Sequence, residues 1–223
     1  MEVYFLPALA VAIFIVVAVV GHIMAKRRRE ALAAFAQSKG LVFCSQPGAV
    51  HETYDALDFR PFGNGHGRRS QNLISGNADG VDWEIFDYRY KTGSGKHQQV
   101  HRHHVVAARV GLHLPRLSMR PEGFFDRVAA AVGFDDIDFE SDAFSRRYHV
   151  KCSDRRLAYD LIHPQMIEYL MTIDAHDWQM AGRLILIVGD RYCAPERLSG
   201  LMSAVVGFTE RLPAYVREDL SRA

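Results

Sequence analysis

The chain contains 223 residues, of which 48% are hydrophobic and 24% are charged. This composition is ordinary for a globular protein, and it excludes a disordered chain, a collagen-like chain and a disulfide-rich scaffold. The formal net charge of +1 gives no electrostatic indication of nucleic-acid binding.

An apolar segment lies at the N-terminus. Residues Val3 to Met24 contain no Asp, Glu, Lys or Arg. A helix over this segment would span roughly 33 Å, which is enough to cross a hydrocarbon core of about 30 Å. Four basic residues follow at once: Lys26, Arg27, Arg28 and Arg29. The positive-inside rule keeps such a cluster in the cytoplasm. The sequence therefore predicts a single-pass anchor in the cell membrane, with residues 3–24 in the bilayer, the N-terminus outside and the rest cytoplasmic.

An uncleaved anchor of the opposite orientation is one alternative interpretation of this segment, and a cleaved signal peptide is another. A cleaved signal peptide requires positive charge before the apolar run and a site with small residues after it. Here the charge comes after the run, which favours the anchor. The three cysteines, Cys44, Cys152 and Cys193, are sparse and form no CxxC pair. They fit reduced thiols in a cytoplasmic domain.

The basic cluster next to the anchor accounts for all of the excess positive charge. Residues 25–223 carry 27 basic and 25 acidic side chains, a net charge of +2, and without the cluster the net charge is −2. Lys26, Arg27, Arg28 and Arg29 are thus candidates for contact with anionic lipid headgroups. A domain of net charge −2 lacks the basic surface that nucleic acids need, so no nucleic-acid partner is predicted.

Local patterns predict helices and antiparallel strands after the anchor. Residues 27–39 predict a helix that continues from the anchor and ends at Gly40. Asp79-Gly80 between two strand-like runs predicts a hairpin. On its second strand, Val81, Trp83, Ile85 and Asp87 share one face. The other expected strands are 41–45, 71–78, 81–91, 98–110, 117–120 after a break at Pro115, 135–139, 146–152, 178–183 and 184–188. The other expected helices are 122–132, 155–162, 165–171, 195–211 and a tail helix after Pro213.

These elements indicate an α+β protein, in which a transmembrane helix precedes one compact domain with a mostly antiparallel sheet and flanking helices. The predicted segments are an anchor over residues 1–25, a basic juxtamembrane helix over 26–40 and a cytoplasmic domain over 41–223.

A histidine-rich run, HQQVHRHH at positions 97–104, is the clearest candidate for chemistry. Alternation along a strand places His97, His101 and His103 on one face and His104 on the other. Imidazoles two residues apart on a strand can reach one metal ion. No HExxH motif and no acidic or cysteine partner at a fixed spacing accompanies them. A polar strand that faces solvent is the other interpretation.

The remaining motifs fail as catalytic signatures. TGSGK at 92–96 lacks the first glycine and the Ser or Thr of a phosphate loop, because Tyr90 and His97 occupy those positions. No GxSxG elbow is present. Asp135, Asp136 and Asp138 lack a calcium-loop pattern and are interpreted as surface acids. No catalytic residue and no cofactor is therefore predicted.

Three segments resemble a family of bacterial membrane-anchored proteins. They are LPRLSMRPE (114–122), FFDRVAAAVGFDDIDFES (124–141) and AFSRRYHV (143–150), which are similar to the family's LPxFxLRPE-like, DIDF-like and FSxxY-like segments. Leu117 stands where that family often has an aromatic residue. The resemblance implies the anchored architecture and no activity, substrate or cofactor.

The leading functional hypothesis is a membrane-anchored protein that acts by binding, with a protein partner at the cytoplasmic membrane face. One alternative is a metal-dependent enzyme that uses His97, His101 and His103. A second alternative is a domain that binds lipid headgroups through residues 26–29.

Overall fold

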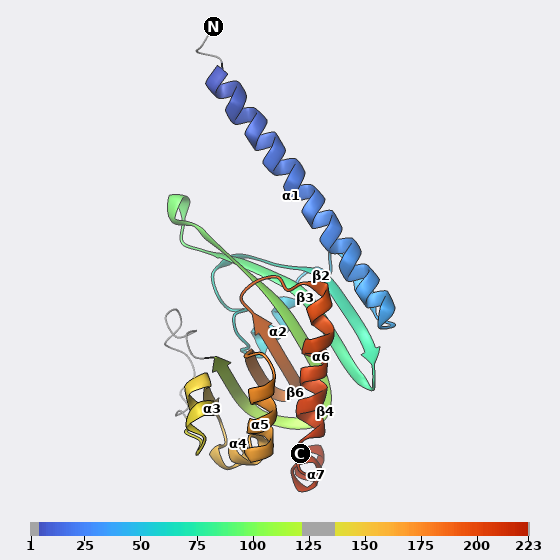
Figure 1. Ribbon diagram of the computed structural model, residues 1–223, viewed down its shortest axis with the longest axis vertical. Coiled ribbons are helices and arrows are strands. Elements are labelled where there is room, and N and C mark those ends of the chain that lie inside the picture. The colour runs from blue at the N-terminus through green and yellow to red at the C-terminus, as the bar shows by residue number, and fades with distance from the viewer. Residues whose placement is uncertain (1–4, 122–136, 223) are drawn as a thin grey trace.

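The fold joins one long helix to an α+β domain with a six-stranded antiparallel sheet (Figure 1). The structure is a computed structural model that describes residues 5–121 and 137–222, with side chains from residue 12 onward. The helices are α1 (Phe5–Ser38), α2 (His51–Ala56), α3 (Asp142–Arg147), α4 (Arg155–Leu161), α5 (Pro164–Thr172), α6 (Pro195–Glu210) and α7 (Ala214–Arg222), with a 3₁₀ turn η2 (Gly95–His97). The strands are β1 (Val42–Cys44), β2 (His66–Ala78), β3 (Val81–Thr92), β4 (Gln99–Pro121), β5 (Tyr148–Cys152) and β6 (Asp177–Gly189).

Helix α1 has two halves with different surroundings. Its N-terminal half projects away from the domain (Figure 1), and the described side chains from residue 12 to residue 27 are exposed. Its C-terminal half packs on the domain, where Leu32 and Ala36 are buried. The predicted helix over 27–39 is thus confirmed as the end of one continuous helix.

Among the described residues, no helix has both the length and the apolar character of a membrane span. The expectation of a transmembrane helix over residues 3–24 is therefore not met by the described part of the chain. Of the predicted segment 3–24, side chains are described only from residue 12 onward.

The sheet is a meander built around the long strand β4. Strands β1, β2, β3 and β4 pair in sequence order, and β4 then pairs with both β5 and β6. The predicted hairpin is confirmed: Asp79 and Gly80 both have positive φ, 53° and 76°, as a tight turn of this kind requires. The segment TGSGK at 92–96, which the sequence excludes as a phosphate loop, lies in the turn that joins β3 to β4. This β3–β4 hairpin extends from the domain on the same side as the N-terminal half of α1 (Figure 1).

Several sequence predictions about strands were wrong. Residues 178–183 and 184–188 form the single strand β6, and the strand predicted over 146–152 begins only at Tyr148, because α3 extends to Arg147. Pro115 does not break the sheet, because β4 continues to Pro121 and Pro115 lies in a register irregularity between Leu114 and Leu117. A strand tolerates proline at such a bulge. Residues 137–139 form no strand, although Ile137 donates a backbone hydrogen bond to Val150. The predicted helix over 122–132 and Asp135 and Asp136 lie outside the described residues.

The two faces of the sheet carry separate hydrophobic clusters. One face, here called the helix face, includes Trp83 and Ile85 and is covered by α1 and by the helices from α3 to α7. Figure 1 shows α6 in front of this face. The opposite face, here called the loop face, carries Phe86, Tyr88 and Tyr90 under α2 and the loop that follows α2. Alternation along β3 explains the division, because successive side chains point to opposite faces.

Candidate functional site

The joint between α1 and the domain is a buried ionic cluster around Asp87. The Asp87 side chain is 3% exposed, and Arg28 of α1 reaches it with two nitrogens, Nε at 2.8 Å and Nη2 at 2.7 Å. Asn72 donates a third hydrogen bond to the same carboxylate at 2.8 Å. The remaining Arg28 nitrogen, Nη1, donates to the Cys193 carbonyl at 2.7 Å. This cluster holds α1 to both β3 and the segment that precedes α6.

The electrostatics of Arg28 match this geometry. Burial alone would lower the pKa of Arg28, but the hydrogen bonds and charge of Asp87 outweigh burial and raise it. The guanidinium also lies 5.0 Å from the centre of the Tyr192 ring, which adds a cation–π contact. Arg28 is therefore fixed as a cation inside the joint.

The four basic residues predicted to face lipid headgroups divide into two roles. Lys26 is exposed and pairs only loosely with Glu30, at 3.8 Å. Arg27 is also exposed, and Arg29 is partly exposed. Arg28 points into the domain, so it is not available to a headgroup. Arg28 is itself 21% exposed, but unlike its three neighbours it is held by hydrogen bonds to Asp87 and Cys193 of the domain.

The predicted histidine set is only partly brought together. His101 and His103 share the loop face of β4, and both stack on Tyr90, with ring centres 4.7 Å and 5.6 Å away. His97 lies in the exposed turn η2 rather than on the strand, because β4 begins at Gln99. The described residues contain no group of three or more His, Cys, Asp or Glu side chains that could hold a metal ion.

Each strand histidine already has a hydrogen-bond partner. His101 Nε2 lies 2.7 Å from the Thr92 hydroxyl, and His103 Nδ1 donates to the Gly189 carbonyl at 2.9 Å. Burial lowers the pKa of His103, and the bond to Gly189 opposes that shift. His103 Nε2 is buried and has no hydrogen-bond partner among the described residues.

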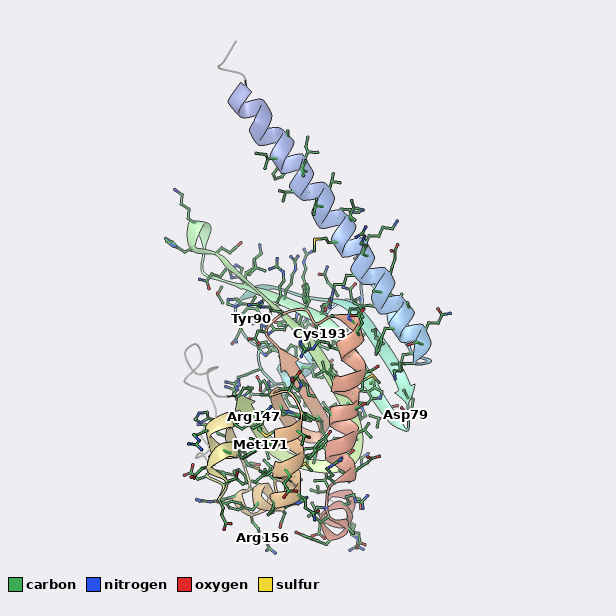
Figure 2. All side chains as sticks on the ribbon, viewed as in Figure 1. Asp79, Tyr90, Arg147, Arg156, Met171 and Cys193 are labelled. Atoms are coloured by element: carbon green, nitrogen blue, oxygen red, sulfur yellow. The ribbon has the colours of Figure 1, made fainter. Side chains whose placement is uncertain are left out.

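These two histidines line a groove of about 1180 Å³, here called the loop-face groove. Its walls come from the loop after α2, the parts of β3 and β4 next to the turn that joins them, the end of β4 at Arg120, and both ends of β6. Strand β6 pairs with β4 only as far as His104 and Gly189, so this groove lies where β6 turns away from β4. Figure 2 places Tyr90, one of the lining residues, near the end of the domain from which the hairpin and α1 project. The charged side chains of its lining are Arg60, Arg102, Arg120, Arg191, Asp177 and Asp190.

An incompletely paired aspartate lies in the wall of this groove. Asp177 is 7% exposed, and its Oδ1 atom lies 3.8 Å from Arg120 Nε, too far for a hydrogen bond. Neither atom has a hydrogen-bond partner among the described residues. Burial raises the pKa of Asp177 to about 6, although the charges of Arg120 and Arg60 act in the opposite direction.

Gln179 positions Arg60 beside this aspartate. The Gln179 side chain accepts from the Arg60 backbone N–H at 2.8 Å and donates to the Arg60 carbonyl at 2.9 Å. Burial lowers the pKa of Arg60, and the charge of Arg120 adds to that shift. No hydrogen bond or ion pair links the Arg60 guanidinium to another described residue. Two guanidinium groups therefore line the groove next to one buried carboxylate.

The sequence indicates the histidines of this groove but not its arginines or Asp177. Arg60, Arg120 and Asp177 come from three distant segments and belong to no local motif. Asp87 did carry a signal, because an acid on the same strand face as Trp83 and Ile85 requires a buried partner.

Comparison with known proteins gives one similar fold. The chain matches the crystal structure of the mycobacterial trehalose monomycolate transport factor A, TtfA, with a TM-score of 0.57 and 13% sequence identity. The match covers 83% of this chain and 93% of that chain. No family model matches the sequence, and no curated protein matches it. At this level of identity the likeness describes the fold alone.

Proposed function

We propose that this protein is a membrane-anchored binding protein whose domain is held at the cytoplasmic face of the cell membrane. The observation that carries the proposal is the contrast between the two halves of α1. Large apolar side chains from Ile13 to Met24 are exposed, from 44% for Ile23 to 74% for Phe14. An apolar surface of this kind is unfavourable in water, and it marks a site of contact with a membrane or a protein.

A bilayer is the occupant that the neighbouring charges favour. Lys26 and Arg27 directly follow the apolar residues and remain exposed. Basic side chains at this position interact favourably with anionic headgroups. The sequence from residue 3 to residue 11 is likewise uncharged.

The joint at Arg28 supports a fixed orientation of the domain relative to the membrane. Arg28 lies one helical turn beyond Met24, and its fork to Asp87 leaves no free linker between the apolar half and the domain. The β3–β4 hairpin extends on the same side as the apolar half (Figure 1). In the proposed arrangement, this hairpin and the loop-face groove would lie near the membrane surface.

We also propose an accessory role in the transport of a cell-envelope amphiphile, together with a protein partner in the membrane. The support is the fold shared with a protein described as a trehalose monomycolate transport factor. The domain would act by binding, since none of the tested catalytic motifs is present in the sequence.

The anchor is tested by extraction of membranes with alkaline carbonate from cells that make the full chain. The test variant carries Val16→Arg and Val17→Arg in the apolar half. The matched control carries Ala34→Arg and Gln37→Arg, two exposed positions in the docked half of the same helix. We expect the natural chain and the control to stay in the membrane pellet and the test variant to leave it. Release of all three proteins would contradict the proposal.

The partner is tested by cross-linking in cells followed by mass spectrometry. We expect a recurring membrane protein that is lost when Arg28→Ala detaches α1 from the domain, and retained with Arg197→Ala on the exposed surface. A cross-linking pattern with no recurring partner would contradict the interaction part of the proposal and leave the anchor unaffected.

A further inference from the structure

The loop-face groove has an unusual charge for this protein. Four arginines and two aspartates line it, which gives a net charge of +2 with the histidines neutral. The chain beyond residue 29 has a net charge of −2. The groove therefore concentrates positive charge on a domain that is otherwise slightly acidic, and it attracts anions.

The incompletely paired groups at one end of the groove indicate what kind of anion fits. Arg120 Nε is buried without a hydrogen-bond acceptor, and the partly exposed Arg60 guanidinium makes no hydrogen bond to another described residue. A buried donor such as Arg120 Nε is normally satisfied by a protein group, water or a ligand. Guanidinium groups present several N–H donors in a planar fork, which matches the oxygens of a phosphate group.

We propose that the loop-face groove binds a phosphate group through Arg60 and Arg120, with the rest of the ligand along Tyr90 and Val188. The phosphate belongs to a lipid headgroup or to a soluble phosphate ester. A groove of about 1180 Å³ is larger than one phosphate needs and slightly exceeds the roughly 300–1,000 Å³ that is usual for binding sites of small molecules. Tyr90 and Val188 supply apolar surface for the remainder of such a ligand.

Asp177 has a defined part in this site. Its carboxylate lies beside Arg120 without forming a hydrogen bond to it, so it competes with a bound anion for the same guanidinium. Removal of the Asp177 charge should therefore strengthen binding of a phosphate. A residue with a purely structural role would not produce a gain in affinity, and this makes Asp177 the sharpest probe of the proposal.

The histidines have a secondary part. His103 Nε2 is buried without a partner and becomes an N–H donor when the ring is protonated. A bound dianion would favour this protonation. His101 and His103 thus contribute to an anion site, whereas two histidines without a third ligand give weak support for a metal site.

The test is isothermal titration calorimetry at pH 7.5 on the full chain in phosphatidylcholine nanodiscs. The probes are inorganic phosphate and glycerol 3-phosphate. We expect glycerol 3-phosphate to bind, and Arg60→Gln to weaken its affinity by about tenfold, the effect of losing a charge-assisted hydrogen bond. The matched control is Arg197→Gln, which removes an exposed arginine outside the groove and should change the affinity by less than about twofold. Asp177→Asn should strengthen binding.

A second set of nanodiscs separates the two sources of phosphate. Phosphatidic acid replaces part of the phosphatidylcholine, and oleate at the same charge serves as the control. Weaker glycerol 3-phosphate binding with phosphatidic acid, but not with oleate, would identify a lipid headgroup as the ligand. Equal affinity for glycerol 3-phosphate in nanodiscs with phosphatidic acid and in nanodiscs with oleate would identify a soluble phosphate ester as the ligand.

Three results would overturn the proposal: no binding of either soluble probe, equal losses with Arg60→Gln and Arg197→Gln, or weaker binding with Asp177→Asn. Binding of the soluble probes does not require α1 to be inserted in a membrane. A failure of this site is therefore distinguishable from a failure of the proposed anchor.

Discussion

The two faces of the sheet each bury an aspartate, and they treat its charge in opposite ways. On the helix face, Asp87 is 3% exposed and receives three hydrogen bonds, two from Arg28 and one from Asn72. On the loop face, Asp177 is 7% exposed, and its Oδ1 atom has no partner within hydrogen-bond distance. Similar burial therefore corresponds to a complete ionic cluster on one face and an incomplete one on the other.

The difference follows from what covers each face. Helices and their apolar side chains close the helix face, so a charge there must be neutralised within the protein. A loop covers the loop face only in part, and the groove beside it remains accessible to solvent or a ligand. We infer that the helix face serves to join α1 to the domain, and that the loop face is the one suited to binding.

The largest expected effect is loss of the joint on the helix face. Arg28→Ala leaves the Asp87 carboxylate buried without its cation, and breaking a buried pair in this way costs about 3–5 kcal/mol. Urea unfolding of the full chain in detergent, followed by tryptophan fluorescence, measures the change. Replacement of both charges, with Arg28→Met and Asp87→Leu, should recover most of the loss. Equal destabilisation by the single and double variants would mean that the packing of α1, and not the charge, is what Arg28 supplies.

The second effect concerns the pH dependence of stability on the loop face. The pKa of Asp177 in the folded protein is about 6, above its ordinary value of 3.8, so the folded state holds the proton more tightly than the unfolded state. Stability from this group is present below pH 4 and is lost as the pH rises to about 6. Asp177→Asn removes this loss. The variant should therefore gain about 3 kcal/mol relative to the natural chain between pH 4 and pH 7.

Histidines titrate in the same pH range as Asp177. The free energy of unfolding is therefore compared between Asp177→Asn and the natural chain at each pH. Burial lowers the pKa of His176 to about 4, so its contribution to stability is lost as the pH falls from about 6.5, which is the opposite direction. Urea unfolding at pH 4, 5, 6 and 7 on both proteins cancels this contribution. Asp219→Asn, at an exposed position on α7, serves as the control and should show no comparable change. If the free energies of unfolding of Asp177→Asn and the natural chain differ by the same amount at every pH, the raised pKa of Asp177 is contradicted.

A smaller effect is expected at the residue that positions Arg60. Gln179→Ala leaves the Arg60 N–H and carbonyl without their side-chain partners, at a cost of about 1–2 kcal/mol. The same variant should weaken glycerol 3-phosphate binding, because Arg60 is no longer held beside Arg120. Gln98→Ala, at the exposed tip of the hairpin, is the matched control for both measurements. Reduced stability with unchanged affinity would show that the position of Arg60 does not matter for binding.

Local signals in the sequence predicted most elements of the fold correctly. The hairpin at Asp79-Gly80 and the helix that begins at Pro195 depend on neighbouring residues, which a sequence displays directly. The break predicted at Pro115 failed because a bulge in β4 accommodates the proline, and a bulge depends on the pairing of β4 with β6.

The candidate site was far less predictable, since its contacts join distant segments. Arg28 was grouped with its basic neighbours, whereas its partner Asp87 lies 59 positions away. The alternation of His101 and His103 was predicted correctly from the strand period, but Arg60, Arg120 and Asp177 meet only after the sheet has formed. A pattern that repeats every two residues shows which side chains share a face, and it does not show which faces meet.

The smallest expected effect tests whether a short ionic contact is enough to stabilise the fold. Arg197 Nη2 and Asp174 Oδ2 lie 2.7 Å apart, the same distance as one contact of the Arg28–Asp87 fork. Their side chains are 63% and 73% exposed, so water screens their charges in both the folded and unfolded states. Arg197→Ala should therefore change the free energy of unfolding by less than about 1 kcal/mol in the same urea experiment. If Arg197→Ala lowers the free energy of unfolding as much as Arg28→Ala does, the distance between the two charges, rather than their burial, determines how much each ion pair stabilises the fold. The expected difference would instead show that burial makes the loss of a partner costly, because a buried charge without its partner cannot be solvated by water. Asp177 is then the buried carboxylate that the fold has not fully neutralised.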